Sequence, residues 1–91
     1  MVLKASIQFK LDLKAIKDVS LHEKIKEVLL SIKVAKSINE VSFLRKIRGN
    51  DNAYKMSVGF YYLVGIMTSE KELTLMRLLH RDEIMHIIKN D

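Results

Sequence analysis

Residues 3–13 read LKASIQFKLDL, and every second residue of this stretch is apolar. The odd positions carry the apolar side chains, whereas the even positions carry charged or polar ones. A period of two is typical of a strand with one buried and one solvated face, whereas an amphipathic helix has a period of 3.6. The stretch therefore predicts a long β-strand over residues 3–13.

The segment that follows changes to a helical period. Its apolar residues recur at spacings of three and four, which predicts an amphipathic helix over residues 21–36. Ser20 followed by Glu23 fits a capping box at the start of this helix. A second box, which begins at Ser69, predicts another helix over residues 70–80.

Three further stretches predict strands. Residues 40–48 carry apolar side chains with imperfect alternation, and residues 54–66 alternate over their whole length. The Gly-Asn-Asp-Asn loop at residues 49–52 lies between them and is expected to reverse a hairpin. Residues 82–90 fit either a continued helix or a last strand, and their β-branched content favours the strand.

The order strand, helix, strand, strand, helix, strand predicts an α+β protein with the ferredoxin-like βαββαβ fold. In this fold, a four-stranded antiparallel sheet carries two helices on one face and leaves its other face open. A chain of 91 residues makes one domain, residues 1–91. In the strand over residues 54–66 the even residues are expected to face the core. This puts Tyr61 and Leu63 on the open face as a candidate protein-partner surface.

Composition limits the classes of function. The chain has no cysteine, which excludes a disulfide scaffold, a thiolate zinc site and a cysteine nucleophile. It has no run of 18 apolar residues, so we expect no membrane partner. The three histidines match no metal-ligand spacing, and no nucleophile has a base next to it in the sequence. We therefore expect a protein that is not an enzyme and binds no metal, no cofactor and no small-molecule substrate.

Positive charge is concentrated in the first half of the chain. The whole chain carries 16 Lys+Arg and 11 Asp+Glu, a net charge of +5. The densest cationic cluster is Arg45, Lys46 and Arg48, with Lys55 just beyond the loop. Four cations around one hairpin tip predict a contact with RNA phosphates, because such contacts release counterions. The alternative is a charged edge strand that discourages aggregation.

Three strings in the second half resemble a known family. Residues 44–47 (LRKI), 59–64 (GFYYLV) and 81–89 (RDEIMHIIK) are similar in type and spacing to small-subunit ribosomal protein S-six. The resemblance implies a structural, non-enzymatic protein that binds small-subunit ribosomal RNA beside ribosomal protein S-eighteen. It also implies that Arg45 and Lys46 contact the RNA, whereas the other two cations of the cluster are assigned from charge and position alone.

Residues 4–6 read KAS where that family usually has an aromatic-glutamate pair. This departure favours an organellar member, on a ribosome of the mitochondrial matrix, over one in bacterial cytoplasm. Two other functions stay open: a ferredoxin-like module for protein interaction or dimerisation, and an RRM-like binder of single-stranded RNA. The second rests on residues 59–63, although Phe60 and Tyr62 are expected to face the core rather than to stack on bases.

Overall fold

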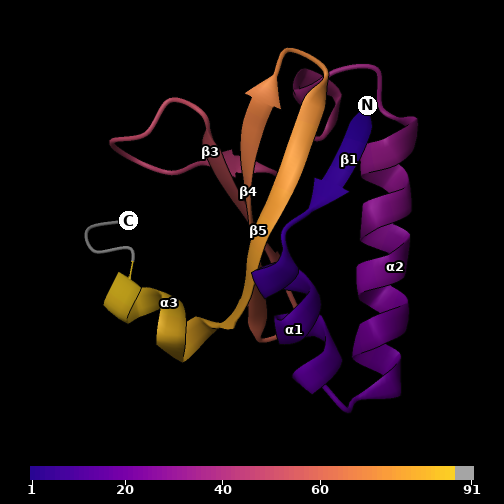
Figure 1. Cartoon of the computed structure of the whole chain (residues 1–91), viewed down its shortest axis with the longest axis vertical. Helices are drawn as coiled ribbons and strands as arrows, with labels where there is room; N and C mark the ends of the chain where they lie inside the picture. The colour runs from indigo at the N-terminus through magenta and orange to yellow at the C-terminus, as the bar shows by residue number, and fades with distance from the viewer. Residues whose placement is uncertain (88–91) are drawn as a thin grey trace.

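The computed structural model describes the backbone of residues 1–87 and the side chains of residues 1–84. Within this part of the chain, five strands form one sheet (Figure 1): β1 (Val2–Ala5), β2 (Arg45–Lys46), β3 (Ala53–Val58), β4 (Tyr61–Ser69) and β5 (Glu72–His80). The helices are α1 (Ile7–Ala15), α2 (Val19–Val34), the short 3₁₀ helix η1 (Ile38–Glu40) and α3 (Arg81–Ile87).

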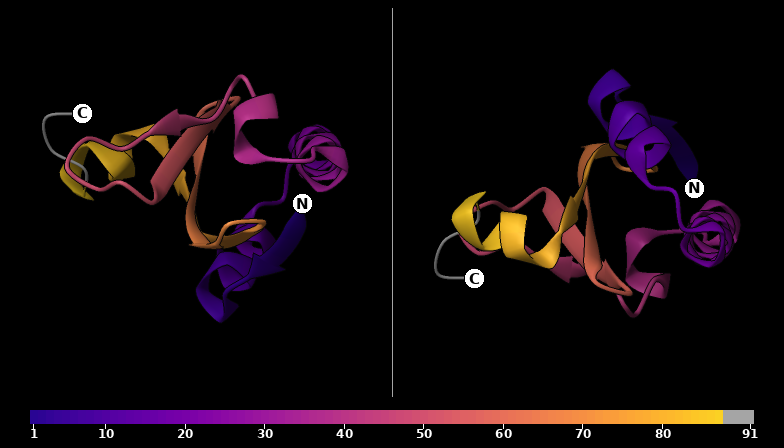
Figure 2. Two further views of the ribbon diagram at one scale, coloured as in Figure 1. Left: turned by 90° about the horizontal axis from the view of Figure 1, so that it is seen from above. Right: turned by 90° about the horizontal axis from the view of Figure 1, so that it is seen from below.

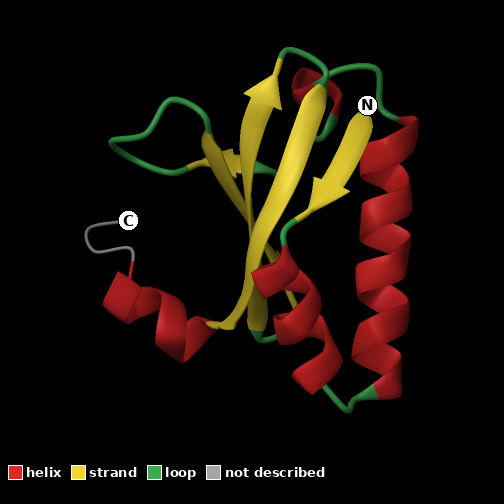
Figure 3. Ribbon diagram, in the orientation of Figure 1, coloured by secondary structure: helices red, strands yellow, loops and turns green. Residues whose placement is uncertain are grey.

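The sheet is mixed. Its strand order is β1-β5-β4-β3-β2, with β1 parallel to β5 and all other neighbours antiparallel. Strands β2 to β5 follow one another as a meander, whereas β1 is separated from β2 by α1, α2 and the short η1 (Figure 3). The prediction of a four-stranded antiparallel, ferredoxin-like βαββαβ sheet is therefore wrong. Short connections join the last four strands, so no helix crosses between them.

The helices lie on different sides of the sheet (Figure 2). Helix α2 packs on one face, α1 lies beside β5 near the β1 edge, and α3 contacts β4 and β5 from the other side. Leu79 and Ile84, both buried, lie where α3 meets the sheet and outside the main core. The largest fully buried side chains belong to that main core, and they are Phe9, Ile25, Ile32, Leu63, Leu73 and Leu75.

Ser6 lies between β1 and α1 and is the N-cap of α1. Its Oγ accepts a hydrogen bond from the backbone N–H of Phe9 at 3.0 Å, which caps the helix. The same hydroxyl donates to the carbonyl oxygen of Met76 in β5 at 2.9 Å. One side chain thus fixes both the start of α1 and its position against the neighbouring strand.

In the second part of residues 3–13 the apolar alternation belongs to helix α1 and not to a strand. Phe9 and Leu13, one turn apart on α1, pack in the core. Ile7 and Leu11, also one turn apart, are 78% and 55% exposed. Two apolar stripes on different sides of one helix give a period of two in the sequence. The predicted long strand is therefore wrong beyond its first residues.

Helix α2 confirms the helix predicted over residues 21–36, shifted by two residues toward the N-terminus. Its N-cap is Asp18, whose Oδ1 accepts hydrogen bonds from the backbone N–H groups of Ser20 and Leu21. The predicted capping box between Ser20 and Glu23 is therefore wrong. The aspartate two residues earlier is the N-cap instead, and it accepts from the amides of Ser20 and Leu21 rather than from that of Glu23.

A hairpin turn interrupts the strand predicted over residues 54–66. Gly59, with a φ of +61°, and Phe60 form the turn between β3 and β4. That φ favours glycine, because a Cβ atom strains the left-handed region. Met56 is buried in the core before the turn and Leu63 after it. The turn thus shifts the core-facing positions from even to odd numbers.

Strand β5 (Glu72–His80) occupies most of residues 70–80, the segment predicted as a helix. Residues 70–71 form a turn, and β5 then runs antiparallel to β4. Glu72 does not cap a helix. Its carboxylate accepts a hydrogen bond from the Thr68 hydroxyl and forms an ion pair with Lys4 at 3.2 Å. The helix prediction is wrong because Leu73, Leu75 and Leu78 of this segment fill the sheet face toward α1 and α2.

Only part of residues 40–48 pairs as a strand. Arg45–Lys46 form β2, an edge strand beside β3, and η1 occupies the start of the segment. The loop at residues 49–52 does reverse a hairpin, as predicted, because β2 and β3 pair antiparallel on either side of it. The long second strand is therefore wrong, although its hairpin is correct.

Helix α3 replaces the last strand that was favoured for residues 82–90. Asp82 and Glu83 lie in its first turn, where acidic side chains interact favourably with the helix dipole. Ile84, 4% exposed, is buried at its contact with the sheet. The strand prediction is wrong for residues 82–87, and residues 88–90 lie outside the described part of the chain.

Candidate functional site

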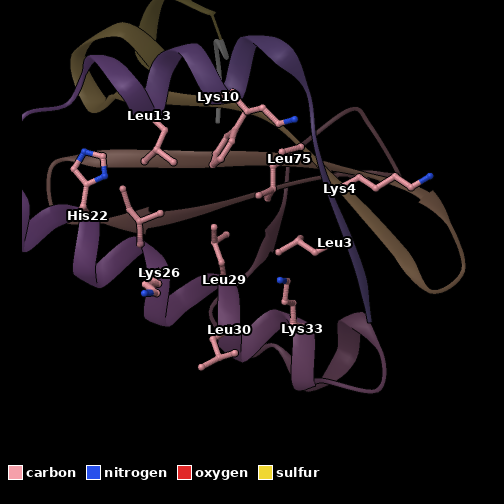
Figure 4. Close-up of a pocket in the computed structure, with 13 residues that line it drawn as sticks. Leu3, Lys4, Lys10, Leu13, His22, Lys26, Leu29, Leu30, Lys33 and Leu75 are labelled. Carbon is pink, nitrogen blue, oxygen red and sulfur yellow. The ribbon is translucent and has the colours of Figure 1, made fainter.

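A groove runs between α1 and α2, which form an antiparallel pair (Figure 4). Its volume is about 610 Å³. Four elements, the consecutive β1, α1 and α2 and the distant β5, build this concave, apolar surface, a shape that ligands and partner segments use. Its apolar lining includes Leu3 of β1, Phe9 and Leu13 of α1, Leu29 of α2 and Leu75 of β5.

The loop between α1 and α2 is fixed by contacts within the chain. Nε2 of His22 donates a hydrogen bond to the carbonyl oxygen of Ile16 at 2.6 Å, and the side chain of Ile16 is buried in the core. A carbonyl oxygen can only accept, so this ring nitrogen carries a hydrogen. Together with the Asp18 cap, this contact holds the two groove walls at a fixed separation at their joined end.

Four lysines surround the groove, and we call them the lysine rim: Lys4, Lys10, Lys26 and Lys33. All four are exposed. Lys4 pairs with Glu72 at 3.2 Å, whereas the other three have no ion-pair partner among the described residues. No acidic side chain of the described part lines the groove. The potential over this apolar surface is therefore positive.

Asp12 fastens α1 to β5. Its carboxylate accepts hydrogen bonds from Nε and Nη2 of Arg77 at 2.8 and 3.3 Å, and from the backbone N–H of Leu78 at 2.9 Å. Strand β1 pairs with β5 only as far as Leu75, so Asp12 reaches an amide that β1 does not. Burial alone would raise the pKa of Asp12, but the hydrogen bonds from Arg77, Leu78 and Gln8 and the charge of Arg77 outweigh it and lower the pKa.

The predicted RNA-contact residues Arg45, Lys46, Arg48 and Lys55 form a second surface, which we call the cationic hairpin. Arg45 lies directly opposite Lys55 in the β2–β3 register, so both share one face, and Lys46 lies on the other. Arg48 is exposed in the loop, and Nζ of Lys55 lies 5.5 Å from the ring centroid of Tyr62. The structure thus brings Arg45 and Lys55 together, while their contact with phosphates stays a prediction.

The predicted partner face at Tyr61 and Leu63 does not lie on an open sheet surface. Leu63 is 0% exposed and belongs to the core. Tyr61 is half-buried and packs edge-on against the ring of His80, with 5.3 Å between the ring centroids. The turn at Gly59 directs both toward the core. Their placement on an open face is therefore wrong.

The sequence interpretation misses the groove, although α2 carries a signal for it. Leu30 and Val34 are apolar yet 61% and 74% exposed, so α2 has more apolar surface than its core contact needs. Lys26 and Lys33 lie seven residues apart, which places them on the same side of the helix two turns from each other. An apolar surface wider than the core stripe, with cations along it, is typical of a helix that has a second neighbour.

Other kinds of site find little support in the described residues. Among them, no group of three His, Cys, Asp or Glu side chains could hold a metal ion. No helix of the described chain is long and apolar enough to cross a membrane. The expectation that the chain is not an enzyme stays a prediction.

No protein-family model and no curated protein sequence matches the chain. Solved structures do match it. A chain of the RelB–RelE antitoxin–toxin complex from Methanococcus jannaschii has a TM-score of 0.75 and 26% identity, over 89% of this chain and 93% of that chain. A chain of the intact E. coli RelBE toxin–antitoxin complex has a TM-score of 0.67 and 16% identity, over 87% and 94%. A chain of the E. coli DinJ–YafQ complex has a TM-score of 0.58 and 16% identity, over 90% of this chain and 94% of that chain.

These likenesses correct the ribosomal interpretation. The structural neighbours come from toxin–antitoxin complexes and share a fold that is not ferredoxin-like. Ribosomal protein S-six as the family, ribosomal RNA and ribosomal protein S-eighteen as partners, and the ribosome or mitochondrial matrix as the location are therefore wrong. The interaction module and the RRM-like binder required the ferredoxin-like fold and are wrong with it.

The three ribosomal-like strings also lie in the wrong elements. Residues 44–47 include the short edge strand β2, residues 59–64 begin with a hairpin turn, and residues 81–87 form α3. The family places the corresponding strings in its second, third and last strands. Short strings of common residue types therefore agreed in order and spacing without sharing their structural positions.

Proposed function

We propose that the chain is one component of a toxin–antitoxin pair, and that it is the toxin. The observation that carries the proposal is the likeness to a chain of the Methanococcus jannaschii complex, with 26% identity and a TM-score of 0.75 over nearly the full length of both chains. The match is not confined to one supersecondary unit. It therefore supports a shared role more strongly than the sheet topology alone.

The choice of toxin rests on how the core is closed. The described side chains form one apolar core across α1, α2 and the sheet, and none of their buried polar atoms lacks a hydrogen-bond partner. A toxin has to keep its fold when its antitoxin is absent. A chain whose core is complete without a partner meets this requirement, whereas a component that acts only on its partner need not.

Inducible expression of the chain in a bacterial host is expected to arrest growth. Colony counts after induction, with the amount of soluble protein measured in parallel, give the result. The matched control is Leu63→Asp, which buries an unpaired charge in the core and should remove the arrest by unfolding the protein. Unchanged growth in cells that contain the folded, soluble chain contradicts the assignment as the toxin.

The cationic hairpin is the surface that we propose for contact with a nucleic-acid target. The supporting observation is the pairing of Arg45 directly opposite Lys55. Directly opposed residues on one face of a strand pair lie close together, so these two cationic side chains can contact neighbouring phosphates. The competing explanation, protection of the β2 edge from aggregation, also fits the strand order.

Replacing Arg45 and Lys46 together by alanine is expected to weaken binding to a labelled nucleic-acid duplex. The slope of log K against log salt should become shallower by about 1.8, because two phosphate contacts are lost. Fluorescence anisotropy at several salt concentrations measures the slope. The double substitution Lys24→Ala with Lys36→Ala removes two exposed lysines elsewhere and should leave most of the slope intact. Equal slopes for the hairpin variant and the wild type assign the hairpin to edge protection instead.

A further inference from the structure

We propose that a pocket beside the cationic hairpin binds a small sugar phosphate. The pocket has a volume of about 320 Å³ and lies between residues 38–44 and strands β2 and β3. It is separate from the groove, because the two share no lining residue. Its volume is at the lower end of the range for ligand pockets, which suits a small molecule rather than a polymer. The binding itself does not depend on the role as a toxin.

The floor of the pocket is apolar and is fixed by contacts within the chain. Val41 is 5% exposed and belongs to the core, and Leu44 packs against that core. The backbone N–H of Leu44 donates to the carbonyl oxygen of Val41 at 3.2 Å, which closes a turn over residues 41–44. Glu40 precedes this turn but does not line the pocket, and its carboxylate accepts a hydrogen bond from the backbone N–H of Lys36 at 3.0 Å. No carboxylate of this segment therefore opposes an anion above the floor.

The strand register places a cation and a phenol on the pocket side of the hairpin. Lys46 on β2 lies directly opposite Tyr54 on β3, so both side chains share one face. Arg45 and Lys55 are opposed at the next register position and face the other way. The four cations of the hairpin are therefore divided, and Lys46 is the one that lines the pocket. A ligand at Lys46 would take one cation from the proposed nucleic-acid contact, and this consequence alone rests on the proposed function.

The rim of the pocket can form hydrogen bonds with both phosphate and hydroxyl groups. It consists of the Asn39 amide, the Ser42 hydroxyl, the Tyr54 phenol and the Lys46 ammonium. In the part of the chain that the structure describes, none of these four side chains has a hydrogen-bond or ion-pair partner. Amides and hydroxyls both donate and accept, as the hydroxyls of a sugar require, whereas an ammonium only donates and suits a phosphate.

The charge of the lining selects an anion, and the number of cations selects one phosphate group. One lysine and no acidic side chain of the described chain line the pocket, so its potential is positive. One ammonium pairs with one phosphate monoester, whereas a nucleic-acid strand brings a phosphate with every nucleotide. The apolar floor covers the carbon atoms of a sugar ring, while the polar rim orients its hydroxyls. A sugar with one phosphate thus matches the floor, the rim and the charge together.

Titration of ribose 5-phosphate into the whole ¹⁵N-labelled chain tests the proposal. For a ligand of about 14 non-hydrogen atoms we expect a Kd of about 1 mM. Amide resonances of residues 38–46 and of Tyr54 should shift and saturate together in two-dimensional NMR spectra. Inorganic phosphate and ribose should each bind about tenfold more weakly, because each fills only part of the pocket. Inorganic phosphate that binds as tightly as ribose 5-phosphate overturns the sugar assignment.

Substitutions at neighbouring positions locate the site. Lys46→Met removes the charge at the rim and should weaken ribose 5-phosphate binding about tenfold, because a hydrogen bond to a charged group is lost. Tyr54→Phe removes only the phenol hydroxyl and should weaken it about threefold. Arg45→Met is the matched control, since it makes the same charge change one residue away on the other face of β2, and it should bind nearly as the wild type does. Lys46 and Arg45 are exposed, so the rest of the NMR spectrum should be unchanged.

The remaining outcomes each overturn the proposal in a definite way. Equal weakening by Lys46→Met and Arg45→Met assigns the effect to the net charge of the chain. Resonance shifts spread over the lysine rim indicate unspecific anion binding. Binding of a 5′-phosphorylated RNA oligonucleotide through Lys46, without binding of ribose 5-phosphate, assigns the pocket to the nucleic-acid contact instead. Growth arrest without ribose 5-phosphate binding refutes this proposal alone, whereas ribose 5-phosphate binding without growth arrest refutes the toxin assignment alone.

Discussion

Replacing Leu63 by alanine is expected to lower the free energy of unfolding by about 3–4 kcal/mol. Leu63 is 0% exposed and is the third residue of β4. It is opposite Met56 on β3 and Leu78 on β5, and both of these are buried in the same core. The truncated side chain leaves a cavity that three adjacent strands cannot easily close. Urea denaturation of the two proteins, analysed with a common m-value, measures the loss.

The neighbouring substitution Val64→Ala is the matched control. Val64 is half-buried and lies opposite Lys55, on the other face of the sheet from Leu63. Its truncation should cost about 1 kcal/mol. A larger loss at Val64 than at Leu63 contradicts the turn at Gly59, because an uninterrupted strand over residues 54–66 directs the even residues to the core.

Turn signals explain why that strand was predicted as continuous. The loop at residues 49–52 is rich in glycine and asparagine, and the sequence predicts it correctly. The turn at Gly59 and Phe60 has one glycine and then an aromatic residue that is 64% exposed. Apolar residues flank both sides of it, so the alternation continues across the turn without a break. Only the tertiary structure shows that the chain reverses there.

Helix prediction succeeded or failed according to where the apolar residues lie around the axis. Helix α2 has its core residues Leu21, Ile25 and Ile32 on one side, which gives a clear period of 3.6. Helix α1 divides its apolar residues between a buried and an exposed stripe, so its period is lost. The segment of β5 matched a capping box at Ser69, but a four-residue motif carries less information than the packing of a whole strand. These are limits of local patterns, which tertiary packing overrides.

The cationic hairpin and the groove also differ in how far the sequence alone can predict them. The four hairpin cations lie within eleven consecutive residues, so the sequence alone could group them. The groove needs residues from β1, α1, α2 and β5, and its outline depends on the angle between two helices. The exposed apolar residues of α2 hinted at a second neighbour, but the lysine rim could be recognised only after α1 was placed beside it.

Replacing Asp12 by alanine is expected to cost about 2–3 kcal/mol of unfolding free energy, because it removes four hydrogen bonds at once, two from Arg77 and one each from Leu78 and Gln8. The side chain of Asp12 is 11% exposed, whereas that of Arg77 is 38% exposed. Water can therefore replace part of what Arg77 loses. The backbone N–H of Leu78 has no partner on β1, because β1 pairs with β5 only as far as Leu75. Most of the loss should therefore come from leaving this amide unpaired. Thermal and urea unfolding at pH 7 measure the change.

The pH dependence of stability separates the charge of Asp12 from its shape. Because hydrogen bonding holds the pKa of Asp12 below its unfolded value of about 3.9, its contribution is complete above that pH and is lost as the pH falls through the lower folded pKa. Asp12→Asn has nearly the same shape and no titrating carboxyl. The difference in stability between wild type and Asp12→Asn should therefore be constant from about pH 5 to 7 and shrink in acid.

The difference between these two proteins is the informative quantity, because other carboxylates titrate in the same range. Hydrogen bonds from Ser20 lower the pKa of Asp18, and those from Thr68 and Lys4 lower the pKa of Glu72. Both groups are common to wild type and variant, so their effects cancel. A difference that stays constant down to pH 2 contradicts the role of the ionised carboxylate. Asp12 would then hold α1 against β5 only by its shape and its bond to the Leu78 amide, both of which asparagine keeps.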